Sequence, residues 1–346
     1  LMNQHQQTQQ NASKIQTFSI GFPVKEYDES KYARQVAEYI GTDHHEFTVE
    51  PDAINILPSL SKHYDEPFAD SSAIPTYLVA REAVKSVKVA LSADGGDELF
   101  AGYNRYLYAH RIPKALTYIH PFFLRILGGA MKGSSIGEGL LAQRMGKVGR
   151  WLENPTMENY MEAMTKLLSD KEISSYFKKD LSLSEFHYPK ATTPLGQMLL
   201  MDTIGYLPND ILHKVDRATM AVGLEGRDPL LDFDLMTYLA SLPDRFKCDG
   251  KESKILLKSI AHDLIPPQLL QGPKKGFAIP INPWMRTHLR KPILEMVDPL
   301  FLKTQGIFNE EKVRKEVLQF LNGKVSNGLF TWYYFNFQMW YRQWMH

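Results

Sequence analysis

The chain has 346 residues, with 40 Lys and Arg against 39 Asp and Glu and a formal net charge of +1. This length allows one large or two ordinary domains with a substantial core. The balanced charge gives no basic excess for nucleic acid, and no stretch is apolar and long enough to cross a membrane, so we expect neither partner. A single cysteine, Cys248, excludes an internal disulfide and fits a reducing compartment, for which we expect the cytoplasm.

The first residues suggest a piece of a longer protein. The chain begins with Leu1 rather than Met, inside a helical-looking phrase, and no signal peptide is visible. Residues 4–14 are rich in Gln and have no apolar anchor, which is typical of a solvated linker or loop.

Strand and helix patterns then alternate. The sequence predicts strands over 15–22, 45–49 and 87–91, and helices over 28–40, from 51 to about 63 and over 74–85. The third strand is a short apolar run of the kind that lies buried. This order predicts an α/β protein with a mostly parallel sheet covered by helices, and ligands bind such sheets at the carboxyl ends of the strands.

After Tyr103 the strand patterns fade, and helices separated by Pro and Gly follow to the end of the chain. We therefore divide the chain into an α/β half, 1–110, and a mostly helical part, 111–346. A basic phrase at 144–150 is more typical of a solvated face than of a nucleic-acid site. The aromatic run 329–340 fits either a membrane-interface helix or a packed terminal helix, and its scattered polar residues favour packing.

The most informative stretch follows the third strand. A loop of small residues with Gly95 and Gly96 leads into a helix pattern that opens with Asp97 and Glu98, an arrangement whose backbone N–H groups can bind an anion. The carboxylates of Asp94, Asp97 and Glu98 would repel a phosphate unless a divalent cation lies between them or one of them does acid–base work. The alternative is a plain strand–turn–helix joint with Asp97 as N-cap.

A second stretch, 207–232, is dense in charge but carries apolar residues at helical spacing. Its charged residues Arg217, Glu225, Arg227 and Asp232 predict either a buried ion-pair network or an arginine that holds a substrate carboxylate in a two-pronged hydrogen bond.

Three smaller features have simpler interpretations. The loop 271–280 carries Lys274 and Lys275, which either reach a phosphate or remain solvated. His44 and His45 are adjacent on a predicted strand and point to opposite faces, so they cannot share a metal ion and we interpret them as structural. Cys248 lies in a turn-like context with nothing to lower its pKa, which predicts an inert thiol.

Several motifs in the same order resemble the synthetase domain of glutamine-hydrolysing asparagine synthetases. The similar segments are TFSIGF at 17–22, the helix start at 28–33, GTDHHE at 41–46, YDEPFADSS at 64–72, LSADGGDELFAGY at 91–103, the charged stretch 207–232 and GPKKGFAIP at 272–280. The resemblance covers nearly the whole chain and implies an ATP-pyrophosphatase-like core.

The resemblance also implies a reaction. ATP and Mg²⁺ activate the side-chain carboxylate of aspartate as an acyl-adenylate, and ammonia then displaces AMP to give asparagine. The ammonia comes from glutamine, in a glutaminase domain that precedes the synthetase domain in the same protein. A homodimer of the protein is also left open as an expectation.

Residue roles follow from matching positions. Asp94 would take a proton from the attacking ammonia, Arg227 would clamp aspartate, and Lys274 would neutralise the departing pyrophosphate. Asp97 would be a Mg²⁺ ligand. The nucleotide would lie against Ile20, Gly21, Ser92, Ala93, Gly95 and Gly96.

The chain departs from the family at its start and at two positions. The SGGxDS loop that grips pyrophosphate belongs just before Leu1 and is absent, as is the glutaminase domain. Ala93 replaces a glycine, and Gly272 replaces an arginine. We therefore expect little or no synthetase activity from this chain alone, and activity from its full-length parent.

Two other functions remain open at this point. One is a relative that adenylates a different carboxylate, as β-lactam synthetases or amidotransferases of surface-polysaccharide gene clusters do. The other is a non-catalytic nucleotide-binding module. The enzyme interpretation requires that the corner ending at Asp97 and the Arg227 region face each other across a cleft.

Overall fold

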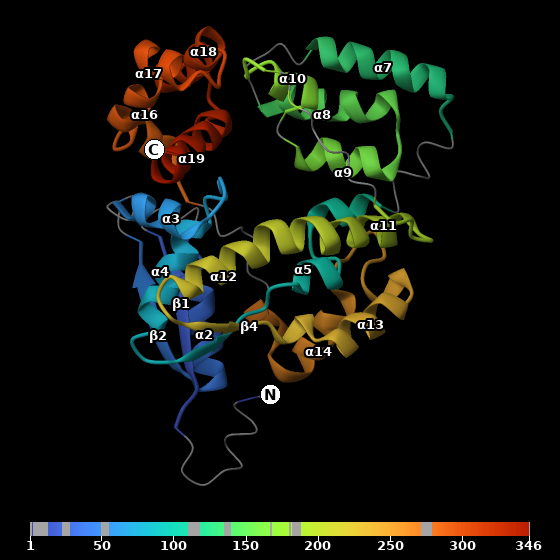
Figure 1. Cartoon of the computed structure of the whole chain (residues 1–346). Helices are drawn as coiled ribbons and strands as arrows, with labels where there is room; N and C mark the ends of the chain where they lie inside the picture. Colours follow the sequence, from blue (N-terminus) through green and yellow to red (C-terminus); the bar gives the residue numbers. More distant parts are fainter. Residues whose placement is uncertain are drawn as a thin grey trace.

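The computed structural model describes residues 2, 13–22, 28–49, 55–109, 118–134, 140–166, 168–179, 181, 188–270 and 279–345. Most of the Gln-rich segment, the start of the helix predicted from 51, and the loop that carries Lys274, Lys275 and Gly272 lie outside these residues. The strands gather on one side of the molecule, a long helix crosses its middle, and two groups of helices lie beyond that helix (Figure 1).

In the part of the chain that the structure describes, four short strands form two parallel pairs. β1 (Gln16–Gly21) pairs with β2 (Asp43–Thr48) along its whole length. β3 (Val89–Leu91) pairs with β4 (Glu225–Arg227). Within the described residues each pair is a separate two-stranded sheet. The parallel α/β class is confirmed, but two strand pairs replace the single sheet that we expected.

The helices between these strands follow the predicted order. α2 (Ser30–Ile40) ends at Gly41, whose φ of 83° is the left-handed C-cap conformation that glycine adopts without strain. The N-cap of α2 is Glu29, not the Asp28 at which the helix was predicted to start, although the Asp28 carboxylate accepts a hydrogen bond from the amide of Ser30, the first helical residue. α3 (Leu57–His63) and α4 (Ala73–Ala83) complete this half.

The β3 strand is half exposed. Ala90 packs toward a small core with Ala80, Ala83 and Leu224, whereas Val89 and Leu91 on the other face are 40% and 50% exposed. Successive side chains of a strand point to opposite faces, so an apolar run is buried throughout only if both faces are covered. The prediction of a fully buried strand is therefore wrong for one face.

A long helix connects the strands to the helical region (Figure 1). It consists of α11 (Pro194–Met201), the π-helical segment η3 (Asp202–Leu212) and α12 (His213–Met220), with Pro208 inside the π-helical part. Most π-helical segments are single turns, and many occur at functional sites. The π-helical segment covers 207–212 of the charged stretch 207–232 and α12 continues it, so the helical spacing of the stretch is confirmed up to Met220.

The remaining elements are helical, as predicted, with β4 as the exception. Between β3 and the long helix lie α5 (Gly96–Leu99), η2 (Asn104–Tyr108), α7 (Pro121–Ser134), α8 (Leu140–Glu153), α9 (Met157–Thr165) and α10 (Asp170–Ser174). After β4 come η4 (Pro229–Leu231), α13 (Phe233–Ser241), η5 (Asp244–Phe246), α14 (Ile255–Leu264) and η6 (Pro267–Leu270). The C-terminal group consists of α15 (Ile281–Arg286), α16 (Arg290–Met296), α17 (Pro299–Gln305), α18 (Glu310–Leu321) and α19 (Leu329–Trp344).

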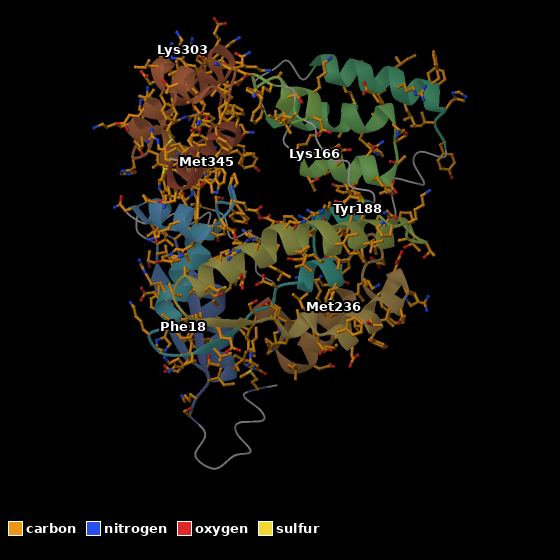
Figure 2. All side chains as sticks on the ribbon, viewed as in Figure 1. Phe18, Lys166, Tyr188, Met236, Lys303 and Met345 are labelled. Carbon is orange, nitrogen blue, oxygen red and sulfur yellow. The ribbon has the colours of Figure 1, made fainter. Side chains whose placement is uncertain are left out.

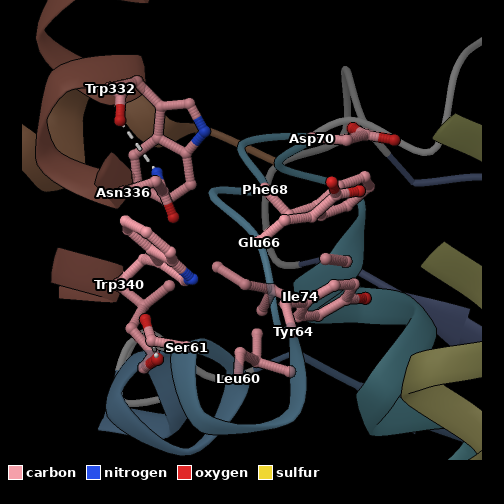
Figure 3. A pocket seen from close by; sticks show the side chains of 12 residues that line it. Leu60, Ser61, Tyr64, Glu66, Phe68, Asp70, Ile74, Trp332, Asn336 and Trp340 are labelled. Carbon is pink, nitrogen blue, oxygen red and sulfur yellow. Dashed lines mark hydrogen bonds between the residues drawn. The ribbon is translucent and has the colours of Figure 1, made fainter. Parts of the chain in front are cut away.

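The aromatic helix α19 is packed against the α/β half. The indole N–H groups of Trp332, Trp340 and Trp344 donate to backbone carbonyls of residues 69, 65 and 61, and Figure 3 shows Trp332 and Trp340 across from Leu60 and Tyr64. The largest apolar cluster of the structure accordingly contains residues from strand β1 and from α19 together. Figure 2 shows side chains along all of these elements, from Phe18 at the strands to Met345 at the C-terminal helices. The prediction of a packed terminal helix is confirmed.

His44, His45 and Cys248 have structural environments. The ring nitrogens of His44 lie 2.9 and 3.0 Å from the hydroxyls of Thr17 and Ser19, and His45 stacks on Phe18. Cys248 is completely buried, and burial raises the pKa of its thiol, as expected of an inert cysteine. In the part of the chain that the structure describes, no helix has both the length and the apolar character needed to cross a bilayer.

Candidate active site

The candidate site is built on the tight corner between β3 and α5. Gly95 has a φ of 83°, and a Cβ at this position would lie 2.2 Å from Cδ2 of Leu231. A Cβ on Gly96 would lie 3.0 Å from Leu230. The two glycines therefore let the η4 turn, which follows β4, lie directly against the corner.

Strand pairing places the second predicted segment beside this corner. Leu91 is the register partner of Arg227, and the amide of Ser92 donates to the Arg227 carbonyl at 3.0 Å. The structure thus brings the corner and the Arg227 region together as the carboxyl ends of neighbouring parallel strands. They lie side by side rather than across a cleft.

The first carboxylate of the corner belongs to a small acidic cluster. The Ser92 hydroxyl lies 2.6 Å from Asp94 Oδ2 and also contacts Asp228 Oδ1. Burial, together with the nearby Asp228 carboxylate, raises the pKa of Asp94. A carboxylate with a raised pKa is a better proton acceptor near neutral pH, as general-base work requires.

Arg227 is on the surface. Its side chain is 63% exposed, and Nε donates to Glu225 two residues earlier at 2.7 Å. Arg217 pairs instead with Asp65, and Asp232 accepts from the Leu235 amide as the N-cap of α13. The buried ion-pair network predicted for these residues is therefore wrong. Arg227 instead presents its guanidinium group at the surface, where a carboxylate could bind it.

The other two carboxylates of the corner are already engaged. Asp97 Oδ1 lies 2.8 Å from Nζ of Lys254, and a Cβ on Gly102 would lie 1.8 Å from the same oxygen. Glu98 is 2% exposed and accepts from the Tyr103 hydroxyl at 2.6 Å, and burial raises its pKa. The three acids thus have three different environments despite their closeness in sequence.

The helix that follows the corner is shorter than its pattern suggested. α5 covers four residues, and Gly95 rather than Asp97 is its N-cap. The macrodipole of a single turn is small, so the helix end adds little to anion binding. Both the expectation of a substantial helix N-terminus and the alternative of an Asp97 cap are corrected.

The fit of these residues to Mg²⁺ rests on donor chemistry. Carboxylate oxygens are ligands that Mg²⁺ prefers, and the ion commonly takes only one or two of them, with phosphate oxygens and water completing the shell. Within the described ranges no cluster of three or more His, Cys, Asp or Glu forms a complete metal cage. Asp97 fits this partial donor set, and Mg²⁺ there would compete with the Lys254 ammonium group for the same oxygen.

The residues predicted to contact adenine are on the other strand pair. Ile20 and Gly21 are buried at the carboxyl end of β1. The two pairs are joined through Phe18 of β1, which packs against the cluster that also contains Ala90 of β3. Their contact with a nucleotide stays a prediction, as do the roles of Lys274, which lies outside the described residues, and of Ala93.

A buried polar cluster next to the corner was not recognised from the sequence. Nζ of Lys214 lies 2.8 Å from Asp70 Oδ2 and 2.8 Å from the Ser72 hydroxyl. Burial alone would raise the pKa of Asp70, but Lys214 and Ser72 outweigh it and hold the pKa below its usual value. The charge of Lys214 also lowers the pKa of Asp94, against the effect of burial, so this cluster and the corner are electrostatically connected.

The same cluster predicts a pH-dependent stability. Burial and the charge of Asp70 raise the pKa of Asp210 to about 6. An Asp side chain in an unfolded chain has a pKa of about 3.9. Between this value and the higher folded pKa, the folded protein binds more protons than the unfolded chain does, so the free energy of unfolding falls as the pH rises through this range. We expect Asp210→Asn to remove this slope and to stabilise the protein at neutral pH, as measured by urea unfolding from mildly acidic to neutral pH. The exposed Asp216→Asn on the same helix is the control, and an unchanged slope in Asp210→Asn would refute the assignment.

The parallel strand pairs and the position of the corner define an α/β protein with an ATP-pyrophosphatase-like fold. Over residues 1–342 the chain matches the family described as asparagine synthase. It therefore belongs to the asparagine synthase family, as the sequence motifs predicted.

Several curated relatives show how far the similarity extends. Asparagine synthetase (glutamine-hydrolyzing) 1 of Bacillus subtilis (strain 168) is 28% identical over 334 residues, which are 94% of this chain and 52% of the relative. A putative asparagine synthetase (glutamine-hydrolyzing) of Mycobacterium tuberculosis strain H37Rv is 32% identical over 285 residues, 79% of this chain and 42% of the relative. A putative asparagine synthetase of Methanocaldococcus jannaschii is 36% identical over 215 residues, 60% and 40% of the two chains. The chain spans about half the length of the B. subtilis relative.

Proposed function

We propose that this chain is the synthetase portion of a glutamine-hydrolysing asparagine synthetase, which converts aspartate to asparagine through a β-aspartyl-AMP intermediate. The observation that carries the proposal is the pairing of β3 with β4, which holds the Asp94 corner beside Arg227. Parallel α/β proteins bind their ligands at such strand ends. Family membership and the names of the relatives supply the class of reaction.

Arg227 would hold the substrate. A guanidinium group offers five N–H donors in a planar fork, and Glu225 contacts two of its three nitrogens. The third nitrogen faces no described carboxylate at salt-bridge distance, so a carboxylate of aspartate can bind there. Glu225 also restrains the orientation of the arginine, which reduces the entropy lost when aspartate binds.

Asp94 would act in the second half of the reaction. The aspartate carboxylate first attacks the α-phosphorus of ATP and pyrophosphate leaves, and ammonia then attacks the acyl carbon and AMP leaves. The attacking nitrogen becomes positively charged and must lose a proton. Asp94, with its raised pKa, would accept that proton, while the Ser92 hydroxyl, which also contacts Asp228, orients its carboxylate.

The nucleotide would lie along Ser92, Ala93, Gly95 and Gly96, with adenine against the backbone of Ile20 and Gly21 and with Lys274 near the pyrophosphate. Mg²⁺, when bound, neutralises phosphate charge and polarises the α-phosphate. Asp97 is the described residue that would hold this ion.

Ammonia would come from an N-terminal glutaminase domain of the full-length protein. The names of the relatives, which include glutamine-hydrolyzing, support this part of the proposal.

The two steps can be separated experimentally in the full-length protein. We expect Asp94→Asn to retain aspartate-dependent exchange between ATP and pyrophosphate but to lose asparagine formation by about 10²–10⁴-fold, because only the second step needs the base. Arg227→Ala should lose both activities, since it removes the group that positions aspartate.

Arg314→Ala, at an exposed arginine of α18, is the matched control and should behave as wild type. Wild-type exchange in Arg227→Ala would contradict the role of this residue. Exchange that depends on another acid, with none on aspartate, would replace the proposed substrate with a different carboxylate.

A further inference from the structure

Helix α7 carries an exposed apolar surface at the outer edge of the molecule, opposite the strands (Figure 1). We define the α7 patch by six side chains at the start of this helix and just before it: Tyr118, Ile119, Phe122, Phe123, Ile126 and Leu127. Phe122 and Phe123 are 60% and 62% exposed, and Tyr118 is 89% exposed. Single exposed apolar residues are common, but a contiguous group with three aromatic rings marks a binding surface.

The pattern of α7 explains why these side chains are not in the core. The buried strip of the helix is narrow and consists of Leu124 and Gly128, with Met131 half-buried beside them. A Cβ on Gly128 would lie 2.8 Å from the carbonyl oxygen of Gly149 in α8, so the two helices approach closely along this strip. The opposite side of α7 is equally apolar. A helix that is apolar on both sides normally buries both, and α7 has only one side against the protein.

The charge of the surrounding sequence indicates what could cover the second side. Arg105 is paired with Asp202, and the residues after it, 106–137, contain four Lys and Arg and no Asp or Glu, although the whole chain is nearly neutral. Within the described side chains, Arg125 is exposed next to the patch on the same helix. A helix that lies in the plane of an anionic membrane surface typically has apolar side chains beside basic ones and has no acidic side chains among them.

We propose that α7 is a membrane-docking helix that places the α7 patch among the acyl chains of an anionic lipid bilayer, with Arg125 at the headgroups. The aromatic rings would enter the boundary between headgroups and acyl chains, and the basic residues would add electrostatic attraction. This inference does not depend on the proposed enzymatic function, and it departs from the expectation that the protein has no membrane partner. The contact is peripheral, because α7 is too short to cross a bilayer.

A second copy of the chain is a poorer fit to the same surface. A symmetric contact through the α7 patch would bring each Arg125, and a segment without any acid, against its own copy. Like charges that face each other disfavour such a dimer, whereas anionic phospholipids offer opposite charge and an apolar layer together.

Vesicle sedimentation of the purified full-length protein tests the proposal. We expect binding to vesicles of phosphatidylglycerol and phosphatidylcholine in equal parts, little binding to phosphatidylcholine alone, and weaker binding at high salt. The double substitution Phe122→Ser and Phe123→Ser should reduce the partition coefficient by at least about tenfold, because burial of each ring contributes to binding. Arg125→Gln should reduce it by a smaller factor of about threefold to tenfold.

The controls use exposed residues elsewhere. Leu300→Ser removes a side chain that is 73% exposed on α17, and Arg314→Gln removes a surface charge on α18, and both should bind as wild type. Hydrogen exchange on the wild-type chain gives a second reading, in which anionic vesicles should protect residues 118–127. The proposal is overturned if the protein does not bind vesicles or binds neutral and anionic vesicles equally. It is also overturned if Leu300→Ser weakens vesicle binding as much as the double substitution at Phe122 and Phe123 does. Self-association through the α7 patch without vesicle binding would overturn it as well.

Discussion

Replacing Gly95 with alanine should destabilise the protein by about 2–4 kcal/mol, because the change combines backbone strain with a steric clash. The left-handed conformation of this residue, with φ at 83°, costs an L-amino acid roughly 1–2 kcal/mol. The new methyl group would also lie 2.2 Å from Leu231, so the η4 turn would have to move away from the corner. The expected readout is a lower urea midpoint with an unchanged slope.

Gly223 provides the matched control for this experiment. It also has a positive φ, 72°, but a Cβ there would meet no atom within 4 Å. Gly223→Ala should therefore show the conformational strain of about 1–2 kcal/mol without the clash. Equal effects of the two substitutions would mean that η4 is not packed against the corner as described.

Replacing Lys214 with methionine should cost about 3–5 kcal/mol, because it leaves the largely buried Asp70 carboxylate without its cationic partner and with hydrogen bonds from Ser72 alone. The side chains of Lys214 and Asp70 are 9% and 23% exposed, so water cannot fully replace the lost ion pair. Lys258→Met is the matched control. The exposed pair of Lys258 with Glu252 should contribute less than about 1 kcal/mol.

The pH dependence of the same variant gives a second test. In the wild type, the pKa of Asp70 in the folded protein lies below its usual value. Asp70 therefore stabilises the folded protein at pH values above its pKa in the unfolded chain. This contribution is lost as the pH falls through the pKa of the folded protein. Lys214→Met should raise the pKa of Asp70 and thereby make the variant relatively more stable on mild acidification. A double variant with Asp70→Asn should be less destabilised than the sum of the single changes. Additive effects would show that the two groups do not interact.

Local sequence patterns predicted most elements of the fold. The apolar runs of β1 and β3, the glycine that ends α2 and the helices on either side are encoded in short segments, and the corner was recognisable from Gly95 and Gly96. Motif order also identified the family. These successes share one cause, which is that each signal depends on residues close together in the chain.

The remaining features depend on contacts between distant residues. β4 is the tripeptide Glu225–Arg227, which has no strand pattern and exists because it pairs with β3. Lys214 meets Asp70 across 144 positions of sequence, so helical spacing alone could not show that this lysine is buried. One of the two interpretations of the charged stretch was a buried network, because its charges are close in sequence, but Arg227 of strand β4 is exposed to solvent.

The central claim is that the Asp94 corner and Arg227 form a single site for the aspartyl-adenylate. Titration of the full-length protein with a sulfamoyl analogue of β-aspartyl-AMP, followed by calorimetry, tests it most directly. The account predicts that Arg227→Ala weakens binding by at least about tenfold, the loss expected for a charged hydrogen bond, while Arg314→Ala binds as wild type. Undiminished affinity in Arg227→Ala, or no binding of the analogue to the wild type, would contradict it.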